Sequence, residues 1–479
     1  MSVDAIIPGA VGADAPARDL NDSDRRLITE SLAAGQAWEY AAALCNGSKH
    51  RFAGSTGEAA AARYLALTLG EIGLSCVARE AFQIQGWQRG VAQLDVLSPE
   101  PQRLHPLALA GTASAAVEGE LSDAGYGTEE EFAALGEMTR GRLVLVRNDW
   151  PAWLKRPMHR GEKTIRAGRY GASALIIMNM EPGLLPLVGA HGFAEAIRPP
   201  AAAVSYEEGW LLASAAERGA TRVRLSIQNL SRPASSQNVM AKLRGQAWPD
   251  RYLLLGAHYD SHDIAPGAVD NAGGVAVMVE AMRLLSHVGL GRSVRVVAFG
   301  AEEVGLLGSE AYVMQHAAEL DGIDLMLNLD CAGGPGAKEM ALDDWPELWT
   351  ALRAPLAGVP DMSLTNWTPS IHSDHYPFMI AGVPTAELTG GQPYVLGRFT
   401  HTAADTLDKL NRLDLQAEAL RVARTVARLS WVAPWTGRRR TPDQVRGVLT
   451  RAGLVDQLAE EGRYPFGPAQ EESAPGNAH

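Results

Sequence analysis

Histidine and carboxylate side chains follow three apolar runs in the second half of this 479-residue chain. They are His258 and Asp260, then Glu302 and Glu303, then Asp330, with Asp270 at the start of a helical stretch. Carboxylates gathered at one place repel and raise one another's pKa, and a bound divalent cation removes that conflict. Imidazoles and carboxylates without thiolates suit zinc, with cobalt or manganese as alternatives. Any one of these residues also fits a solvated loop, but together they predict a metal site.

The apolar runs predict the elements that bring these side chains together. Strands are expected over 251–260, 293–300 and 323–329, and helices over 271–288 and 308–320. Strands that alternate with helices indicate an α/β fold with a mainly parallel, doubly wound sheet. Ligands bind beyond the carboxyl ends of the strands in such a sheet, so the predicted strands place the candidate residues at one edge.

The remaining sequence indicates a second, β-rich unit inserted into the α/β domain. Short strands punctuated by Pro and Gly run from about 94 to 230, and the segment SRPASS (231–236) is typical of a linker. The predicted division is an α/β domain over 18–95 and 232–434, an inserted domain over 96–231, and a C-terminal extension over 435–479.

Composition excludes several classes of protein. Forty-three Lys and Arg against 55 Asp and Glu give a net charge of −12, which argues against nucleic acid or an anionic membrane as partner. Three scattered cysteines, Cys45, Cys76 and Cys331, form no disulfide framework. The first 14 residues lack the features of a signal peptide, and no apolar run reaches the roughly 18 residues of a membrane span. We therefore expect a cytoplasmic protein; whether it forms a homo-oligomer stays open.

Five ordered motifs make the chemistry more specific. They are HYDSHDIAPGAVDNAGG (258–274), FGAEEVGLLGSEAY (299–312), LNLDCAGG (327–334), SDHYPF (373–378) and HTAADT (401–406). This set resembles the co-catalytic di-zinc aminopeptidase family, which also has glutamate-carboxypeptidase-like members. The segment RFAGSTGEAAAARYL (51–65) resembles the family's first motif.

The resemblance implies a role for each matching residue. Asp270 would bridge two zinc ions, His258 and Asp330 would complete one site, and Glu303 and His401 would complete the other. Glu302 would act as general base on a metal-bridging water and pass its proton to the leaving amine.

The residues around these ligands carry weaker predictions. Asp260 is expected to hold the second ring nitrogen of His258, and Asp405 to act in the same way near His401. His262 and Asp263 are expected to shape their loop rather than bind metal. Cys331 is expected to fill a small space in the core.

One departure from the family pattern leaves the oxyanion donor open. Some relatives carry a Tyr immediately before the last metal-binding His, and here that position is Thr400. Tyr376 and Tyr394 are the alternative donors, unless the metals alone carry the charge.

The inserted segment resembles the protease-associated domain, on RGRLVLVRNDW (140–150) and KTIRAGRYGASALIIMNM (163–180). It has no cluster of His or carboxylates of its own. We expect either a wall or lid over the cleft or a purely structural lobe, and the sequence does not separate these two roles.

The resemblance therefore implies a zinc metallo-exopeptidase that acts on peptides, with an aminopeptidase as the leading interpretation. A carboxypeptidase or dipeptidase is the alternative within the class. Such an enzyme needs a cation for the substrate carboxylate, and Arg398 is a candidate. A non-catalytic binding homologue and a single-zinc acyltransferase are further alternatives, but all five ligand positions and Glu302 are filled, which disfavours both.

Overall fold

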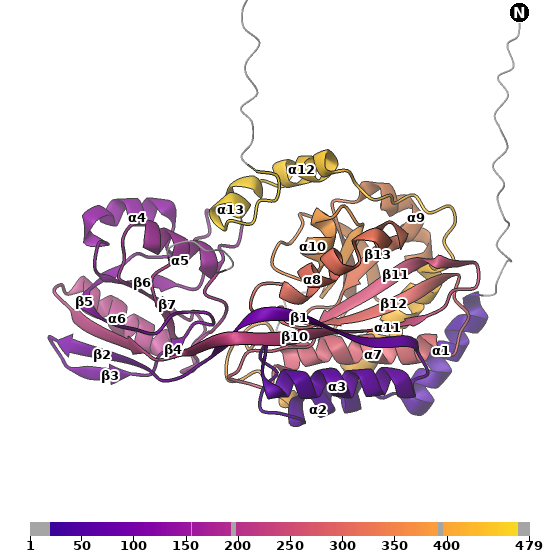
Figure 1. Ribbon diagram of the computed structural model, residues 1–479, viewed down its shortest axis with the longest axis horizontal. Helices are drawn as coiled ribbons and strands as arrows, with labels where there is room; N and C mark the ends of the chain where they lie inside the picture. The colour runs from indigo at the N-terminus through magenta and orange to yellow at the C-terminus, as the bar shows by residue number, and fades with distance from the viewer. Residues whose placement is uncertain (1–19, 155, 193–197, 391–395, 468–479) are drawn as a thin grey trace, which may run out of the picture.

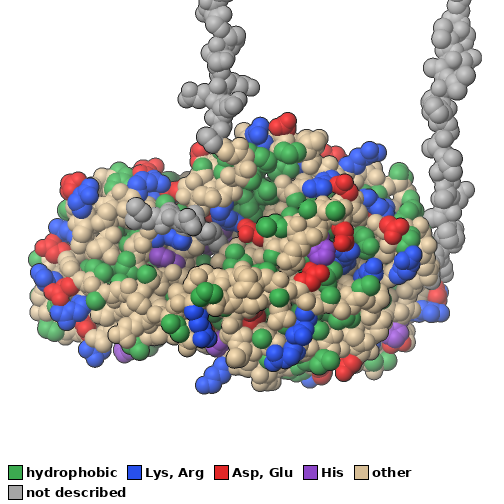
Figure 2. All heavy atoms as spheres, in the orientation of Figure 1, with side chains coloured by type: hydrophobic (Ala, Val, Ile, Leu, Met, Phe, Trp, Pro, Cys, Tyr) green, Lys and Arg blue, Asp and Glu red, His purple; other side chains and the backbone are tan. Residues whose placement is uncertain are grey.

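The computed structural model describes residues 20–154, 156–192, 198–390 and 396–467. Two lobes, each built on its own sheet, are joined by the long ribbon of strands β1 (Ser75–Gln88) and β10 (Leu230–Leu243) (Figure 1). Acidic and basic side chains are interspersed over the face that Figure 2 shows. None of the helices in the described ranges has the length and apolar character needed to cross a membrane.

The larger lobe contains the predicted mainly parallel sheet. Its strand order is β1, β10, β12 (Arg292–Phe299), β11 (Trp248–His258), β13 (Ile323–Asn328), β16 (Thr385–Gly390), β14 (Lys338–Asp343) and β15 (Met362–Trp367). The central strands β12, β11, β13 and β16 pair in parallel, whereas β10 pairs antiparallel with β12. The fully buried runs of β11, β12 and β13 explain why their sequences are continuously apolar.

Helices cover both faces of this sheet. One face packs against α1 (Leu20–Ala34), α2 (Ala37–Asn46), α3 (Thr56–Glu71), α7 (Gly273–Leu285), α9 (Pro346–Leu356) and α11 (Arg412–Leu429). The other face packs against α8 (Leu307–Gln315) and α10 (His375–Ile380), where Tyr312 and Phe378 meet Phe299 of β12. The site therefore lies on a sheet that is buried on both sides.

The linker expected at 231–236 is instead part of β10, and that prediction was wrong. These residues pair with β1, from Ser231 opposite Trp87 to Ser236 opposite Phe82. β10 pairs with β12 only from Val239 onward, so Pro233 lies where one side of the strand has no partner in the sheet. A proline is tolerated there because its missing N–H breaks no bond of the ladder.

The smaller lobe carries the predicted β-rich unit. Its sheet has the order β3 (Gln102–Leu104), β2 (Ala92–Ser98), β9 (Arg222–Ile227), β5 (Ala115–Asp123), β6 (Leu143–Arg147), β7 (Ala174–Met178), β8 (Ala201–Val204) and β4 (Leu107–Ala108). Helices α4 (Glu129–Leu135), α5 (Arg160–Arg169) and α6 (Tyr206–Glu217) complete it. The chain changes sheets between Gln88 and Ala92 and returns between Ile227 and Leu230; the domain bounds themselves stay a prediction.

The C-terminal helices α12 (Pro442–Arg451) and α13 (Val455–Glu460) bridge the two lobes (Figure 1). Val445, Leu449 and Leu458 pack with Tyr376 and Met379 of the larger lobe. On the smaller lobe, the Glu460 carboxylate accepts hydrogen bonds from Arg166 and Arg169 of α5. The extension thus holds the inserted lobe against the larger one.

Candidate metal centre

The predicted ligands meet at the carboxyl edge of the larger sheet. His258 ends β11, Glu302 and Glu303 follow β12, and Asp330 follows β13. Asp270 lies in the turn before α7, and His401 lies between β16 and α11. All six line one cavity of about 260 Å³. The tertiary structure therefore brings together every residue that the motifs assigned as ligand or base.

Asp270 lies between the two histidines. Its Oδ1 is 3.1 Å from His258 Nε2, and its Oδ2 is 3.1 Å from His401 Nε2. On the outer sides, Asp330 Oδ1 is 3.3 Å from His258 Nε2, and Glu303 Oε2 is 3.5 Å from His401 Nε2. One carboxylate thus faces two separate groups of donors.

His262 lies closer to this cluster than the sequence indicated. Its Nε2 is 2.8 Å from Glu303 Oε2, and its ring contacts that of His401 edge to face at 4.5 Å. His262, Glu303 and His401 have the mutual spacing of a metal-binding group, as do His258, Asp270 and Asp330. The spacing of His258 and His262 in HYDSH was the sequence signal for this proximity, although we expected His262 only to shape its loop.

Asp260 contacts three parts of the site without lining the cavity. Its Oδ1 is 3.5 Å from His258 Nδ1 and accepts a hydrogen bond from the Glu302 backbone N–H at 3.1 Å. Its Oδ2 accepts one from the Glu303 N–H at 3.2 Å. One fully buried carboxylate therefore faces the imidazole and fixes the turn that carries both glutamates.

Asp405 and Ser373 position the other carboxylates. The Asp405 carboxylate accepts hydrogen bonds from the N–H groups of Val269 and Asp270, at 2.7 and 3.1 Å. Its contacts therefore hold the Asp270 turn rather than the ring of His401, where the sequence led us to expect it. Ser373 Oγ donates to Asp330 Oδ2 at 2.5 Å.

The electrostatics of the cluster fit bound cations. Burial raises the pKa of Glu302 well above its usual range, and neighbouring Asp330 raises it further. Burial and Asp270 raise the pKa of Glu303 to about 8. Burial also opposes the charge of Asp270, but its hydrogen bonds to His258 and His401 hold its pKa well below the usual value. Buried carboxylates that repel one another around two imidazoles are a donor set for divalent metal ions.

The backbone near the cluster is strained at three non-glycine residues. Ala301, Cys331 and His401 have φ angles of 56°, 55° and 58° in the left-handed region. Such conformations are uncommon outside glycine and gather at functional sites, where the surrounding structure holds them. Gly300, beside this turn, admits no side chain because a Cβ would lie 2.4 Å from Ser236 Oγ.

Of the two alternatives to the missing Tyr, only Tyr376 lies within the described residues, and it does not line the cavity. Tyr376 is buried between α10 and the C-terminal extension, with its hydroxyl 3.4 Å from the Arg463 carbonyl oxygen. Tyr394 lies outside the described residues. Thr400 Oγ1 donates to the Gly397 carbonyl at 2.8 Å. Cys331, expected in the core, instead lies half-buried in the cavity wall.

The inserted lobe forms one wall of the cavity through His159, Arg160 and Ala190. The ring of His159 stacks on that of His372 at 4.3 Å, and His372 Nε2 is 3.2 Å from Glu461. No sequence motif distinguished these residues of the insert. Arg160, for example, is one of many arginines in the chain. By contrast Arg398, the expected carboxylate ligand, is exposed and lies over the Phe399 ring.

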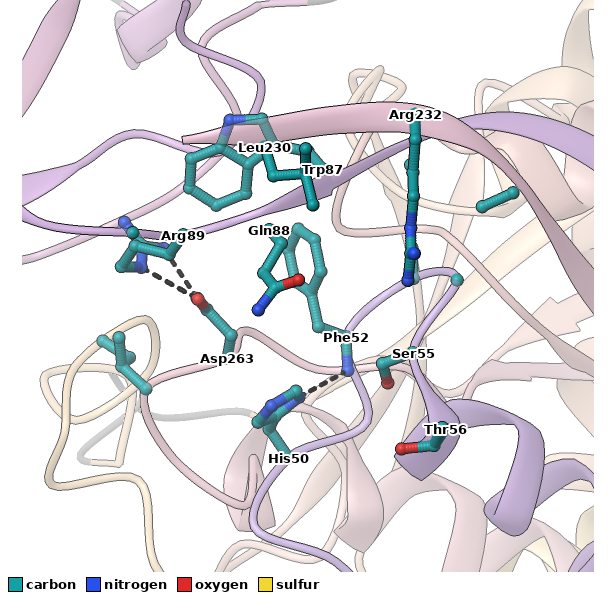
Figure 3. Close-up of a pocket in the computed structure, with 16 residues that line it drawn as sticks. His50, Phe52, Ser55, Thr56, Trp87, Gln88, Arg89, Leu230, Arg232 and Asp263 are labelled. Carbon is teal, nitrogen blue, oxygen red and sulfur yellow. Dashed lines mark hydrogen bonds and ion pairs between the residues drawn. The ribbon is translucent and has the colours of Figure 1, made fainter. Parts of the chain in front are cut away.

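A second cavity of about 560 Å³ lies between residues 50–56 and the ribbon formed by β1 and β10 (Figure 3). Gln88 and Arg232 point into it, and Asp263 pairs with Arg89 through two nitrogens, the shortest contact being 2.6 Å. Two successive residues of one loop therefore contact different cavities. His262 contacts Glu303 of the candidate metal site, and Asp263 lines the second cavity.

Comparisons with known proteins agree with this architecture. A model of peptidase family M28 matches residues 238–426, and a model of the PA domain matches residues 105–212. Aminopeptidase YwaD of Bacillus subtilis is 31% identical over 311 residues, which are 62% of this chain and 63% of that protein. Carboxypeptidase Q of Xenopus laevis is 27% identical over 323 residues, 65% of this chain and 68% of that protein.

A solved structure extends the likeness to the fold. The zinc aminopeptidase BSAP from Bacillus subtilis superposes with a TM-score of 0.65 at 26% identity, covering 82% of this chain and 93% of that one. The matched segments contain the ligand cluster and the inserted lobe in the order seen here. On these grounds the chain belongs to peptidase family M28, as a zinc metallopeptidase with a PA domain inserted before its catalytic motifs.

Proposed function

We propose that this protein is a di-zinc exopeptidase that releases N-terminal residues from short peptides. The observation that carries the proposal is the position of Asp270, whose two carboxylate oxygens face His258 and His401 at 3.1 Å each. A carboxylate with a histidine on either side is suited to bridge two ions. His258 and Asp330 would hold one ion, and Glu303 and His401 the other.

Glu302 is suited to move the proton in this reaction. It lines the cavity beside the ligand Glu303, and its backbone N–H is fixed by Asp260. Two zinc ions at the site would polarise the scissile carbonyl and acidify water. The Glu302 carboxylate would accept the proton released from that water and deliver it to the leaving amine.

The shape and charge of the cavity support action at a chain end. The inserted lobe closes one side, and about 260 Å³ of space leaves room for only a short stretch of peptide. Glu302 and Glu387 line the cavity and can accept hydrogen bonds from a free ammonium group. A free amino terminus is therefore the substrate end that this acidic wall favours.

Glu302→Gln tests the separation of base and ligand. The variant should retain two zinc ions per chain by elemental analysis and lose hydrolysis of aminoacyl anilides by at least about a hundredfold. Loss of a zinc ion would instead make Glu302 a ligand. A wild-type protein that binds zinc but cleaves neither anilides nor dipeptides would overturn the proposed activity.

Three other expectations stay predictions. Zinc is the metal that the donor set favours, with cobalt and manganese as alternatives for the native ion. We propose a cytoplasmic location on the ground that the three cysteines are unpaired. Formation of a homo-oligomer is the third, and light scattering on the purified protein would test it.

A further inference from the structure

The second cavity, between residues 50–56 and the ribbon, shares no lining residue with the metal cavity. Phe52, Trp87 and Leu230 form an apolar part of its wall. The rings of Phe52 and Trp87 lie 5.9 Å apart, and Leu230 is 52% exposed. A concave space of about 560 Å³ with an apolar wall and a few polar groups is typical of a site for a small molecule.

Arg232 gives this cavity an unpaired positive charge. Its side chain points into the space from β10 (Figure 3). Among the described residues, no carboxylate pairs with its guanidinium and no group accepts its N–H bonds. Asp263 also lines the cavity, but Arg89 binds both of its carboxylate oxygens. Because Arg89, Arg232 and Asp263 are the charged side chains of the lining, the cavity carries one net positive charge.

Three further side chains supply hydrogen-bond donors to the lining. The Gln88 amide points into the space and has no partner in the part of the chain that the structure describes. Arg89, whose side chain is 9% exposed, has a buried Nη1 without an acceptor in the same ranges. His50 Nδ1 accepts from the Phe52 N–H at 3.3 Å, and burial lowers the pKa of His50, so the neutral ring carries its proton on Nε2. These donors suit an anionic, hydrogen-bond-accepting group.

The floor of the cavity is tied to the loop that carries His262. Arg51 is fully buried, and its backbone N–H donates to Ser261 Oγ at 3.0 Å. Its guanidinium donates to the carbonyl oxygens of Tyr259 and Gly267, at 2.6 and 3.0 Å. Residues 50–56 and 259–267 therefore form one connected wall.

This wall also reaches the metal site. The Phe52 ring lies 6.4 Å from the ring of His262, whose Nε2 is 2.8 Å from Glu303 Oε2. Asp263, the next residue, lines the second cavity. A ligand that contacts Phe52 and Asp263 is thus separated from the metal-site carboxylate by a single side chain.

We propose that the second cavity binds a small carboxylate with an apolar group, and that the bound ligand stabilises the loop 259–267. The carboxylate would pair with Arg232, and the apolar group would pack on Phe52, Trp87 and Leu230. A single negative charge balances the one net positive charge of the lining. The planar guanidinium also matches the geometry of a carboxylate, which it binds through two parallel hydrogen bonds.

Calorimetry on the full-length, zinc-loaded protein tests the carboxylate, with phenylpropionate as the probe. Arg232→Gln should weaken its binding at least about fivefold, because a charge-assisted pair is lost. Leu230→Glu places a negative charge at the exposed rim of the cavity and should also weaken it. Arg244→Gln changes an exposed arginine just after β10 and should bind phenylpropionate as the wild type does. Phenylpropionamide, which lacks the charge, should bind at least about fivefold more weakly than the acid.

Hydrogen exchange locates the bound probe. Phenylpropionate should slow exchange of the amides in 50–56, 86–90 and 259–267, in the wild type and Arg244→Gln but not in Arg232→Gln. Protection without any change in 259–267 would overturn the stabilisation of the loop. Binding that survives Arg232→Gln, as binding at the metal cavity would, overturns the carboxylate site, and so does equal binding of acid and amide.

The source of the ligand follows from a third probe, L-phenylalanine. Binding as tight as that of phenylpropionate would support amino acids, the products of a peptidase, as one source. Binding of phenylpropionate alone would support a carboxylate without an amino group. Absence of binding by both up to about 10 mM would overturn the proposal. None of these measurements depends on turnover, so their outcome is separate from that of the proposed peptidase activity.

Discussion

Val188 of the inserted lobe and His401 of the metal cluster hydrogen-bond to each other in both directions. The Val188 N–H donates to the His401 carbonyl at 2.9 Å, and the Val188 carbonyl lies 3.1 Å from His401 Nδ1. This pairing leaves Nε2 of His401, which faces Asp270 and Glu303, as the nitrogen free of a proton. The inserted lobe thus hydrogen-bonds directly to a residue of the candidate metal centre.

Weakening this pairing should weaken zinc binding. Val188→Pro removes the N–H that holds the His401 backbone, and we expect zinc affinity to fall roughly tenfold or more, since partners of this kind tune ligand orientation. Competition with a chromogenic chelator would measure it. Val188→Ala keeps both backbone groups and is the matched control. Equal affinity in the proline variant would mean that the lobe does not orient His401.

Asp260→Asn should impair the site without removing a ligand. Asp260 accepts from two backbone N–H groups and faces His258 Nδ1, and an amide replaces one acceptor oxygen with a donor. We expect kcat/KM on leucine p-nitroanilide to fall about 10- to 100-fold. Asp263→Asn alters a carboxylate on the same loop that pairs with Arg89, and should affect turnover far less. Comparable losses of kcat/KM in both variants would mean that the conformation of the whole loop, and not the contacts of Asp260, controls turnover.

Metal removal should destabilise the fold. Without cations, Glu302, Glu303 and Asp330 remain gathered around His258 and repel one another. A ligand at a thousand times its Kd contributes about 4 kcal/mol, so chelation should lower Tm by several degrees and added zinc should restore it. Differential scanning calorimetry would measure the shift. A Tm that stays constant while the metal content falls to zero would contradict a structural contribution of zinc.

The burial of Lys163, outside the candidate metal site, predicts that the free energy of unfolding depends on pH. Its side chain is fully buried, and Nζ donates to the carbonyl oxygens of Arg147 and Asp149. Burial lowers its pKa to about 7, against about 10.4 in an unfolded chain. Between these values the unfolded chain binds more protons, so the contribution of Lys163 to the free energy of unfolding rises with pH, by at most about 1.4 kcal/mol per unit.

Lys163→Met tests this sign. Urea unfolding at pH 7, 8 and 9 should show that the stability of the variant relative to wild type falls as the pH rises. Arg169→Met, at an exposed position of the same helix, should show a difference that does not depend on pH. A constant difference for Lys163→Met would mean that this lysine stays charged in the folded protein over the whole range.

The central strands of the larger sheet, and the candidate ligands at their ends, were predictable from local sequence patterns. The continuous apolar runs of β11, β12 and β13 reflect burial on both faces, and parallel strands bring the residues at their carboxyl ends to one edge. His258, Glu303 and Asp330 could therefore be placed from the sequence alone. The linker prediction at 231–236 failed because Pro and Ser are typical of loops, and only the pairing with β1 shows that one side of β10 is unpaired there.

The tertiary structure alone decided which residues outside the motifs reach the site. Arg160 and His401 are 241 residues apart, and no local pattern encodes a contact made by two lobes closing on each other. Arg398, three residues from His401, was the plausible cation by proximity in sequence, yet its side chain lies on Phe399. Sequence determined the chemistry of the candidate metal ligands, because strand ends and motifs are local. The inserted lobe is held in place by Glu460 and the connecting ribbon. Its docking determined that the Arg160 side chain and the Val188 carbonyl lie beside His401.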